Sequence, residues 1–206
     1  MSVRVQFEQH VREAVAQLVR RTIARAPITP NTLTVIGTLM TIATVPLISR
    51  GYFLAAGLAL ILTSVFDMLD GALARVTQRT SAFGAFLDSA LDRYSDALLL
   101  FGFFMYFQHT APGAVESTLA FLATIGSLLT SYMRARAEAV GFACKVGLVE
   151  RPERMVLIIL GLLTGWVAPM LWVLAVLTNV TALQRLLHVW HSERSSHGGA
   201  PRPNQR

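Results

Sequence analysis

All five aspartates of this 206-residue chain lie between residues 67 and 96, inside one of its most apolar regions. The other seven of its 12 acidic residues are glutamates outside that window. A carboxylate at bilayer depth costs about 2.5–3.5 kcal/mol on insertion scales, so several together would destabilise apolar helices unless cations, water or hydrogen bonds compensated. The clustering therefore indicates a bound divalent metal rather than a solvated charged face.

The spacing of these aspartates places them on two helix faces. Asp67 and Asp70 are three residues apart, whereas Asp88, Asp92 and Asp96 recur every four residues, so each set shares one face of a helix. Oxygen donors with no histidine or cysteine nearby suit Mg²⁺, Mn²⁺ or Ca²⁺ better than zinc or copper. Two metals among carboxylates are a recurrent arrangement for phosphoryl chemistry, in which a further carboxylate takes the proton of an attacking hydroxyl.

Small and basic residues flank the carboxylates. Gly71, Ala74 and Gly84 would let a phosphorylated ligand approach the backbone closely. Arg75, one turn beyond Gly71, offers a fork of donors to phosphate oxygens. The alternative is a set of intramembrane ion pairs with the arginines of this region, but such pairs contribute little net stability and would not require this spacing.

Composition identifies the elements that must position these residues. The chain is 53% hydrophobic and only 15% charged, against roughly 25% charged in ordinary soluble domains. A helix needs about 20 residues to cross a hydrocarbon core of roughly 30 Å. Six apolar spans can be drawn: 31–49, 52–76, 82 to the APG break at 111–113, 117–139, 152–167 and 169–190. We therefore predict an all-α, polytopic membrane protein with six transmembrane helices.

The two ends of the chain differ from this apolar region. Residues 1–26 place apolar side chains on one helical stripe and arginines largely elsewhere, which predicts an amphipathic juxtamembrane helix lying in the interface, or packed on protein. No removable signal peptide is visible in them. Residues 27–190 form the predicted six-helix domain, and the polar tail 191–206 is predicted to be disordered. The single cysteine, Cys144, excludes an intrachain disulfide.

Charge placement predicts the orientation in the membrane. Of the 18 basic residues, only Arg50 falls in a connection on the side opposite to the others. By the positive-inside rule both termini and the aspartate-bearing connection are cytoplasmic, in a multi-pass protein of the cell (inner) membrane. The net charge of +6 then reflects orientation and anionic membrane lipids, and no nucleic acid partner is expected.

The aspartate pattern D-x2-D-G-x2-A-R-x8-G-x3-D-x3-D, from Asp67 to Asp92, resembles without departure the signature of the CDP-alcohol phosphotransferases. These membrane enzymes move a phosphatidyl or phosphoalcohol group from a cytidine diphosphate donor. The resemblance implies a six-helix fold, usually a homodimer, whose site opens to the cytoplasm. It assigns two Mg²⁺ (or Mn²⁺) ions to Asp67, Asp70, Asp88 and Asp92, makes Asp92 also the base, and gives donor contacts to Gly71, Ala74, Arg75, Ser81 and Gly84.

A second resemblance, over most of the chain, concerns the acceptor. The segments PNTLTVIG at 30–37, LDSALDRYSD and SYMRARAEAVG are similar to the branch that uses CDP-diacylglycerol and inositol 1-phosphate, yielding phosphatidylinositol phosphate and CMP. It adds Asn31 and Thr34 as donor contacts and Arg134, Arg154 and Arg185 as the acceptor-phosphate site, although that branch carries lysine where Arg134 stands. Arginines at the ends of two spans, and one inside an apolar run, independently favour an anionic acceptor.

Other functions remain open at this point. The same chemistry could use glycerol 3-phosphate or another polar alcohol as acceptor, or an archaeal ether-lipid donor. A divalent-cation transporter also buries carboxylates among helices. The glycine positions, Arg75 and the crowding of acidic residues toward one side of the membrane argue against transport.

Overall fold

The computed structural model describes the backbone of residues 29–77 and 81–197, and the side chains of 29, 31–66 and 81–194. All regular secondary structure in these ranges is helical, which confirms the predicted all-α class for this part of the chain. The chain divides into two compact units, Met1–Gly102 and Phe103–Arg206. The predicted amphipathic helix over 1–26 lies outside the described residues.

The first unit begins with a capped helix. Helix α2 (Pro30–Ala43) follows Thr29, whose hydroxyl accepts a hydrogen bond from the amide of Thr32 at 3.3 Å. Pro30 occupies the first turn, where its missing N–H costs nothing. A short helix, α3 (Val45–Ser49), comes next. The single span predicted over 31–49 is thus two helices, because Pro46 has no N–H to continue the hydrogen-bond ladder of α2.

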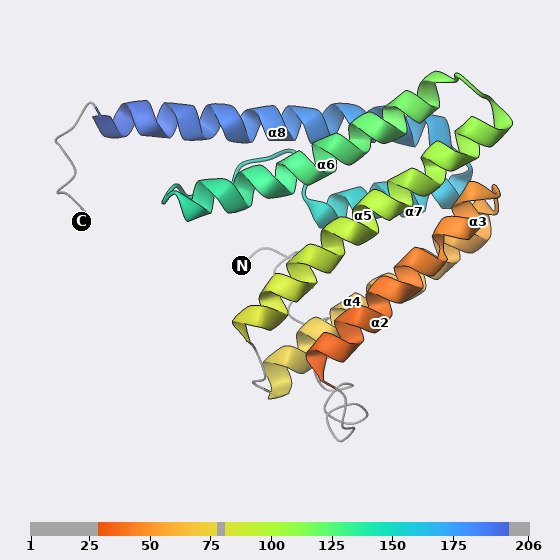
Figure 1. Cartoon of the computed structure of the whole chain (residues 1–206), viewed down its shortest axis with the longest axis horizontal. Coiled ribbons are helices and arrows are strands. Elements are labelled where there is room, and N and C mark those ends of the chain that lie inside the picture. The colour runs from red at the N-terminus through yellow and green to blue at the C-terminus, as the bar shows by residue number, and fades with distance from the viewer. Residues whose placement is uncertain (1–28, 78–80, 198–206) are drawn as a thin grey trace, which may run out of the picture. The chain divides into compact units, whose positions relative to one another are not determined.

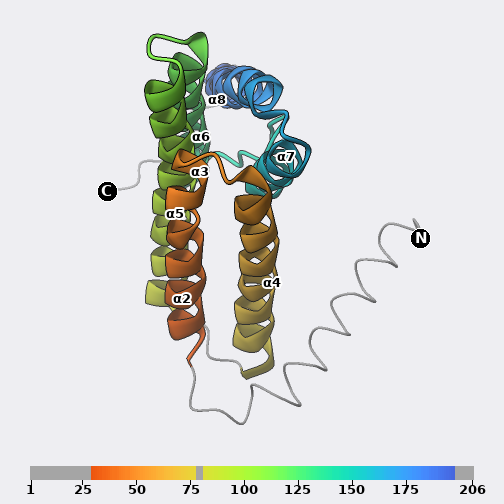
Figure 2. The same cartoon turned by 90° about the vertical axis from the view of Figure 1, so that its right-hand side faces the viewer.

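Two long helices complete the aspartate-bearing part of the chain. Helix α4 (Phe53–Thr77) contacts α2, and the two run side by side in Figure 2. Helix α5 (Ala82–Thr110) approaches α3 closely, since a Cβ built on Gly102 would lie 3.3 Å from side-chain atoms of Ile48 and Val45. Leu60 and Leu99 belong to the buried core of this unit.

The second unit is organised by a pair of helices. Helix α6 (Val115–Ala139) and helix α8 (Val167–His197) contact each other over much of their length and run side by side in Figure 1. The two helices approach closely at Gly126, where an added Cβ would collide with the side chains of Thr178 and Asn179. The hydroxyl of Thr130 also donates to the carbonyl of Thr178 at 3.0 Å. Helix α7 (Arg151–Thr164) packs on α8.

The C-terminal helix is longer than predicted. Helix α8 continues through His197, whereas the predicted span ended at residue 190 and the tail from 191 was expected to be disordered. The reason is that the sequence offers no helix breaker before Gly198, and that the Arg194 guanidinium stacks on the Trp190 ring at 4.0 Å. Residues 198–206 lie outside the described residues.

Among the residues that the structure describes, two helical segments are long and apolar enough to cross a membrane by length and composition, Asn31–Ser49 and Val167–Arg194. Helix α7, with 14 residues, spans only about 21 Å at 1.5 Å per residue. Helix α5 carries its aspartates in its first half. Large apolar side chains are nevertheless exposed along several helices, including Leu39, Phe86 and Trp172, as expected of surfaces that contact lipid.

Candidate active site

Helix α5 presents three aspartates at successive turns. Asp88 is exposed, the side chain of Asp92 is 20% exposed, and Asp96 is 8% exposed, so burial increases along one face of the helix. Asp92 lies beside Arg93, with 3.9 Å between Oδ2 and Nη1, which is a loose ion pair. Asp88 and Asp92 thus offer accessible carboxylate oxygens of the type that binds a hard divalent cation.

The remaining predicted metal ligands belong to the C-terminal half of α4. Asp67, Asp70, Gly71, Ala74 and Arg75 all stand on its helical backbone, but their side chains lie outside the described residues. A continuous helix puts Asp67 and Asp70 on one face, as the spacing predicted. The convergence of these carboxylates with those of α5 stays a prediction.

Three of the predicted donor-contact residues meet at the start of α5. Ser81 precedes the helix, and its hydroxyl accepts a hydrogen bond from the amide of Gly84 at 2.9 Å, so Ser81 is the N-cap. A Cβ added to Gly84 would lie 2.8 Å from Oδ1 of Asn31 and 3.1 Å from Oγ of Ser81. Gly84 therefore allows α2 and α5 to approach closely here. Thr34 follows Asn31 by one turn on α2.

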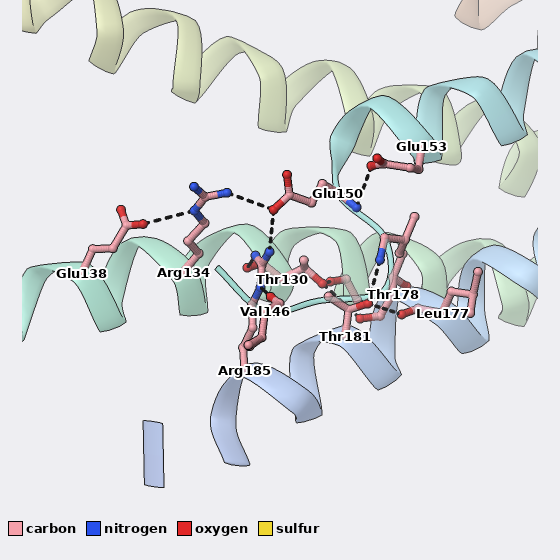
Figure 3. Close-up of polar contacts among 12 residues, drawn as sticks. Thr130, Arg134, Glu138, Val146, Glu150, Glu153, Leu177, Thr178, Thr181 and Arg185 are labelled. Carbon is pink, nitrogen blue, oxygen red and sulfur yellow. Dashed lines mark hydrogen bonds and ion pairs between the residues drawn. The ribbon is translucent and has the colours of Figure 1, made fainter. Parts of the chain in front are cut away.

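In the second unit, two predicted arginines meet at one carboxylate oxygen (Figure 3). Arg134 on α6 contacts Glu150 with 3.0 Å between Nη1 and Oε1, and Arg185 on α8 contacts the same oxygen with 3.4 Å from Nη2. Arg134 also pairs with Glu138 at 3.1 Å. Arg154, in the first turns of α7, is 4% exposed.

Arg185 is fixed by the backbone around it. It is 2% exposed, donates from Nη1 to the carbonyl of Thr130 at 2.6 Å, and donates from Nε to the carbonyl of Val146 at 2.8 Å. The connection between α6 and α7 passes close by, since a Cβ on Gly147 would lie 3.2 Å from Nη2 of Arg185. The hydroxyl of Thr181 accepts from the amide of Val149 at 3.3 Å and holds the same connection on α8.

Sequence reasoning missed Glu150 as a member of this cluster. The sequence around Glu150 indicates only the start of a helix, since Glu150 and Glu153 form a capping box at the start of α7. Nothing in that pattern indicates a contact with Arg185, which is 35 residues away in sequence. The contact depends on how α6, α7 and α8 pack together.

Comparisons with known proteins agree with the aspartate signature. A sequence model of the family described as CDP-alcohol phosphatidyltransferase matches residues 27–186. The chain is 40% identical over 171 residues to the archaetidylinositol phosphate synthase of Pyrococcus horikoshii, covering 81% of this chain and 86% of the relative. It is 37% identical over 184 residues to the phosphatidylinositol phosphate synthase of Mycobacteroides abscessus, covering 84% and 81%.

Solved structures give the same answer. The phosphatidylinositol phosphate synthase of Mycobacterium tuberculosis with CDP-DAG bound superposes with a TM-score of 0.78 at 29% identity, covering 88% of this chain and 94% of that one. The same enzyme in complex with manganese and citrate gives a TM-score of 0.77 at 30% identity, covering 87% and 88%. The divalent metal in that complex agrees with the carboxylate donors of this chain. The signature, the fold and these matches together establish that the chain belongs to the CDP-alcohol phosphatidyltransferase family and is a phospholipid-synthesising enzyme.

Proposed function

We propose that this enzyme transfers the phosphatidyl group of CDP-diacylglycerol to a hydroxyl of inositol 1-phosphate and releases CMP. The observation that carries the choice of acceptor is the meeting of Arg134 and Arg185 at a single anionic oxygen. Guanidinium groups arranged around one oxygen suit a phosphate monoester better than a neutral alcohol. The names of the relatives from M. abscessus and M. tuberculosis support the same substrates.

Asp92 acts as the general base in this proposal. Its carboxylate accepts the proton of the attacking hydroxyl, the hydroxyl oxygen forms a bond to the β-phosphorus of the donor, and the bond from that phosphorus to the bridging oxygen breaks. CMP leaves with the electron pair of the broken bond. The exposure of Asp92, 20%, keeps its carboxylate within reach of a substrate while most of the side chain packs in the helix face.

The other predicted residues bind and orient the substrates. Two divalent cations, Mg²⁺ or Mn²⁺, held by Asp67, Asp70, Asp88 and Asp92, would neutralise the diphosphate and orient the leaving group. Asn31, Ser81 and Gly84 meet at the start of α5 and, with Thr34, Gly71, Ala74 and Arg75, are proposed to contact the CDP moiety. Arg134, Arg154 and Arg185 orient the acceptor through its phosphate.

The membrane arrangement belongs to the same proposal. Six spans, with both termini and the site on the cytoplasmic side, are supported by the positions of the basic residues. Exposed apolar side chains on α2, α4, α5, α6 and α8 support contact with lipid. A homodimer is proposed from the resemblance to the family alone.

The second candidate differs in the donor. The relative from Pyrococcus horikoshii, 40% identical, is named for an archaetidyl product. An ether-linked CDP-lipid therefore competes with CDP-diacylglycerol as the donor. A remaining alternative keeps the donor and replaces the acceptor with glycerol 3-phosphate or another polar alcohol.

CMP release by the purified protein tests these assignments. We expect the highest kcat/KM with inositol 1-phosphate among inositol, inositol 1-phosphate and glycerol 3-phosphate, each assayed with both donors. Asp92→Asn should reduce kcat by about 10²–10⁴-fold, the usual contribution of a general base. Glu116→Gln, in the first turn of α6, is the matched control and should retain activity. Preference for glycerol 3-phosphate, or near-normal turnover by Asp92→Asn, would refute the acceptor or the base.

A further inference from the structure

Glu150 stands where an anionic ligand of the two arginines would stand. Its Oε1 lies 3.0 Å from Nη1 of Arg134 and 3.4 Å from Nη2 of Arg185, and Figure 3 shows the carboxylate between the two guanidinium groups. A phosphate oxygen binding to both arginines would make the same two contacts. The carboxylate and the phosphate therefore require the same donors.

The arginines keep their positions without Glu150. Two backbone carbonyls hold Arg185, that of Thr130 at 2.6 Å and that of Val146 at 2.8 Å, so its Nη2 is directed by the fold. Arg134 has a second carboxylate partner, Glu138, at 3.1 Å from its Nε. Removing the charge of Glu150 therefore leaves Arg185 oriented by the backbone, leaves Arg134 its contact with Glu138, and makes donors of both guanidinium groups available.

Glu150 is also able to leave the arginines at low cost. Its side chain is 46% exposed, so water can solvate the carboxylate once it turns away. Its backbone is fixed as the N-cap of α7, with its amide donating to Oε2 of Glu153 at 3.0 Å. In the capping box the Glu150 side chain also accepts from the amide of Glu153, which gives the carboxylate a partner apart from the arginines.

We propose that Glu150 is a specificity-determining residue that occupies the acceptor-phosphate position in the free enzyme and must be displaced when the acceptor binds. This inference rests on the proposed function, because it takes Arg134 and Arg185 as the phosphate site. A phosphate monoester brings about two negative charges near neutral pH and can replace a single carboxylate. A neutral polyol brings none, so Glu150 helps to restrict the enzyme to phosphorylated acceptors.

The test compares wild-type protein with Glu150→Gln, both as full-length chains in nanodiscs. Glutamine keeps the size of the side chain and an oxygen for the helix cap but removes the charge. The KM for inositol 1-phosphate should fall about three- to tenfold, the range expected for one partly exposed charge interaction, with the KM for the CDP-lipid unchanged. The Kd of inorganic phosphate, measured by calorimetry without turnover, should fall by a similar factor.

Glu138→Gln is the matched control. Glu138 also contacts Arg134, but the two residues are four positions apart on the same helix and the side chain of Glu138 is 53% exposed. That variant should change the same constants by less than about twofold. An unchanged or higher KM and phosphate Kd in Glu150→Gln would overturn the role of Glu150. If the wild-type enzyme rejects inositol 1-phosphate while phosphate binding still tightens in Glu150→Gln, the proposed acceptor fails and the role of Glu150 stands.

Discussion

Arg185 combines two functions in one side chain, since it binds backbone carbonyls and directs a donor toward Glu150. Its guanidinium reaches the carbonyl of Thr130, the carbonyl of Val146 and the carboxylate of Glu150 together. Lysine has one ammonium group and cannot reproduce this fork of donors. The buried charge of Arg185 is tolerated because each of the three guanidinium nitrogens has an acceptor.

Arg185→Lys should therefore weaken both acceptor binding and folding. We expect the KM for the phosphorylated acceptor to rise at least about tenfold, as for loss of a charge-assisted bond. The free energy of unfolding should fall by about 1–3 kcal/mol, because buried carbonyls lose their donors. Steady-state kinetics and thermal unfolding in detergent measure the two effects. Arg136→Lys, at an exposed position of α6, is the control, and equal effects in both variants would contradict the special position of Arg185.

At the level of single residues, the sequence predicts which side chains share a helix face better than it predicts which side chains from different helices touch. The regular spacing of Asp88, Asp92 and Asp96 determines their common helix face, because helix geometry is local. The choice of Arg134 and Arg185 for one phosphate site depended on resemblance to a family. Glu150 was missed because its contact with Arg185 requires three helices to pack in one particular way.

The helices themselves were largely predictable, and the departures have local causes. Thr29 and Pro30 mark the start of α2, and Gly165, at φ 75°, ends α7. The break at Thr44 follows from Pro46, and the extension of α8 follows from the absence of a breaker before Gly198. The close contact at Gly126 could not be predicted, because a glycine within a helix does not indicate which helix faces it.

The packing of α6 on α8 provides a test at Gly126. Alanine there should gain up to about 1 kcal/mol from helix propensity alone. The added Cβ, however, would collide with Thr178 and lie 2.7 Å from Nδ2 of Asn179, which donates to the carbonyl of Leu122. We therefore expect Gly126→Ala to lower the free energy of unfolding by about 1–3 kcal/mol. Ala135→Gly, at an exposed site on α6, measures the contribution of helix propensity separately. If Gly126→Ala instead raised the free energy of unfolding, α8 would be able to move away from the added Cβ.

The start of α5 provides a second test at the element scale. Ser81→Ala removes the acceptor of the Gly84 amide and should lower the free energy of unfolding by about 1 kcal/mol. Ser81→Asn restores an N-cap but not a hydroxyl, so stability should return. If the hydroxyl also contacts the donor, the KM for the CDP-lipid stays raised in both variants. A donor KM that recovers with stability in Ser81→Asn would show that Ser81 acts only as a cap.

At the scale of the whole molecule, the proposed membrane topology rests on the order of apolar spans and basic residues in the sequence, and cysteine labelling can test it. The only native cysteine, Cys144, is buried, and Cys144→Ser provides a background without thiols. Single cysteines replace Arg50, Ala111 and Trp166, all exposed at the ends or connections of helices, and Lys145 and Arg194, exposed after α6 and near the end of α8.

If six segments cross the bilayer with both termini inside, the first three positions react with a membrane-impermeant maleimide in intact cells, whereas the last two react only after lysis. Labelling of Lys145→Cys in intact cells would refute this topology, because the positive-inside rule places the basic connection of residues 140–150 in the cytoplasm. Failure of Trp166→Cys to react before lysis, with normal reaction at Ala111→Cys, would instead show that the 14 residues of α7 do not cross the membrane.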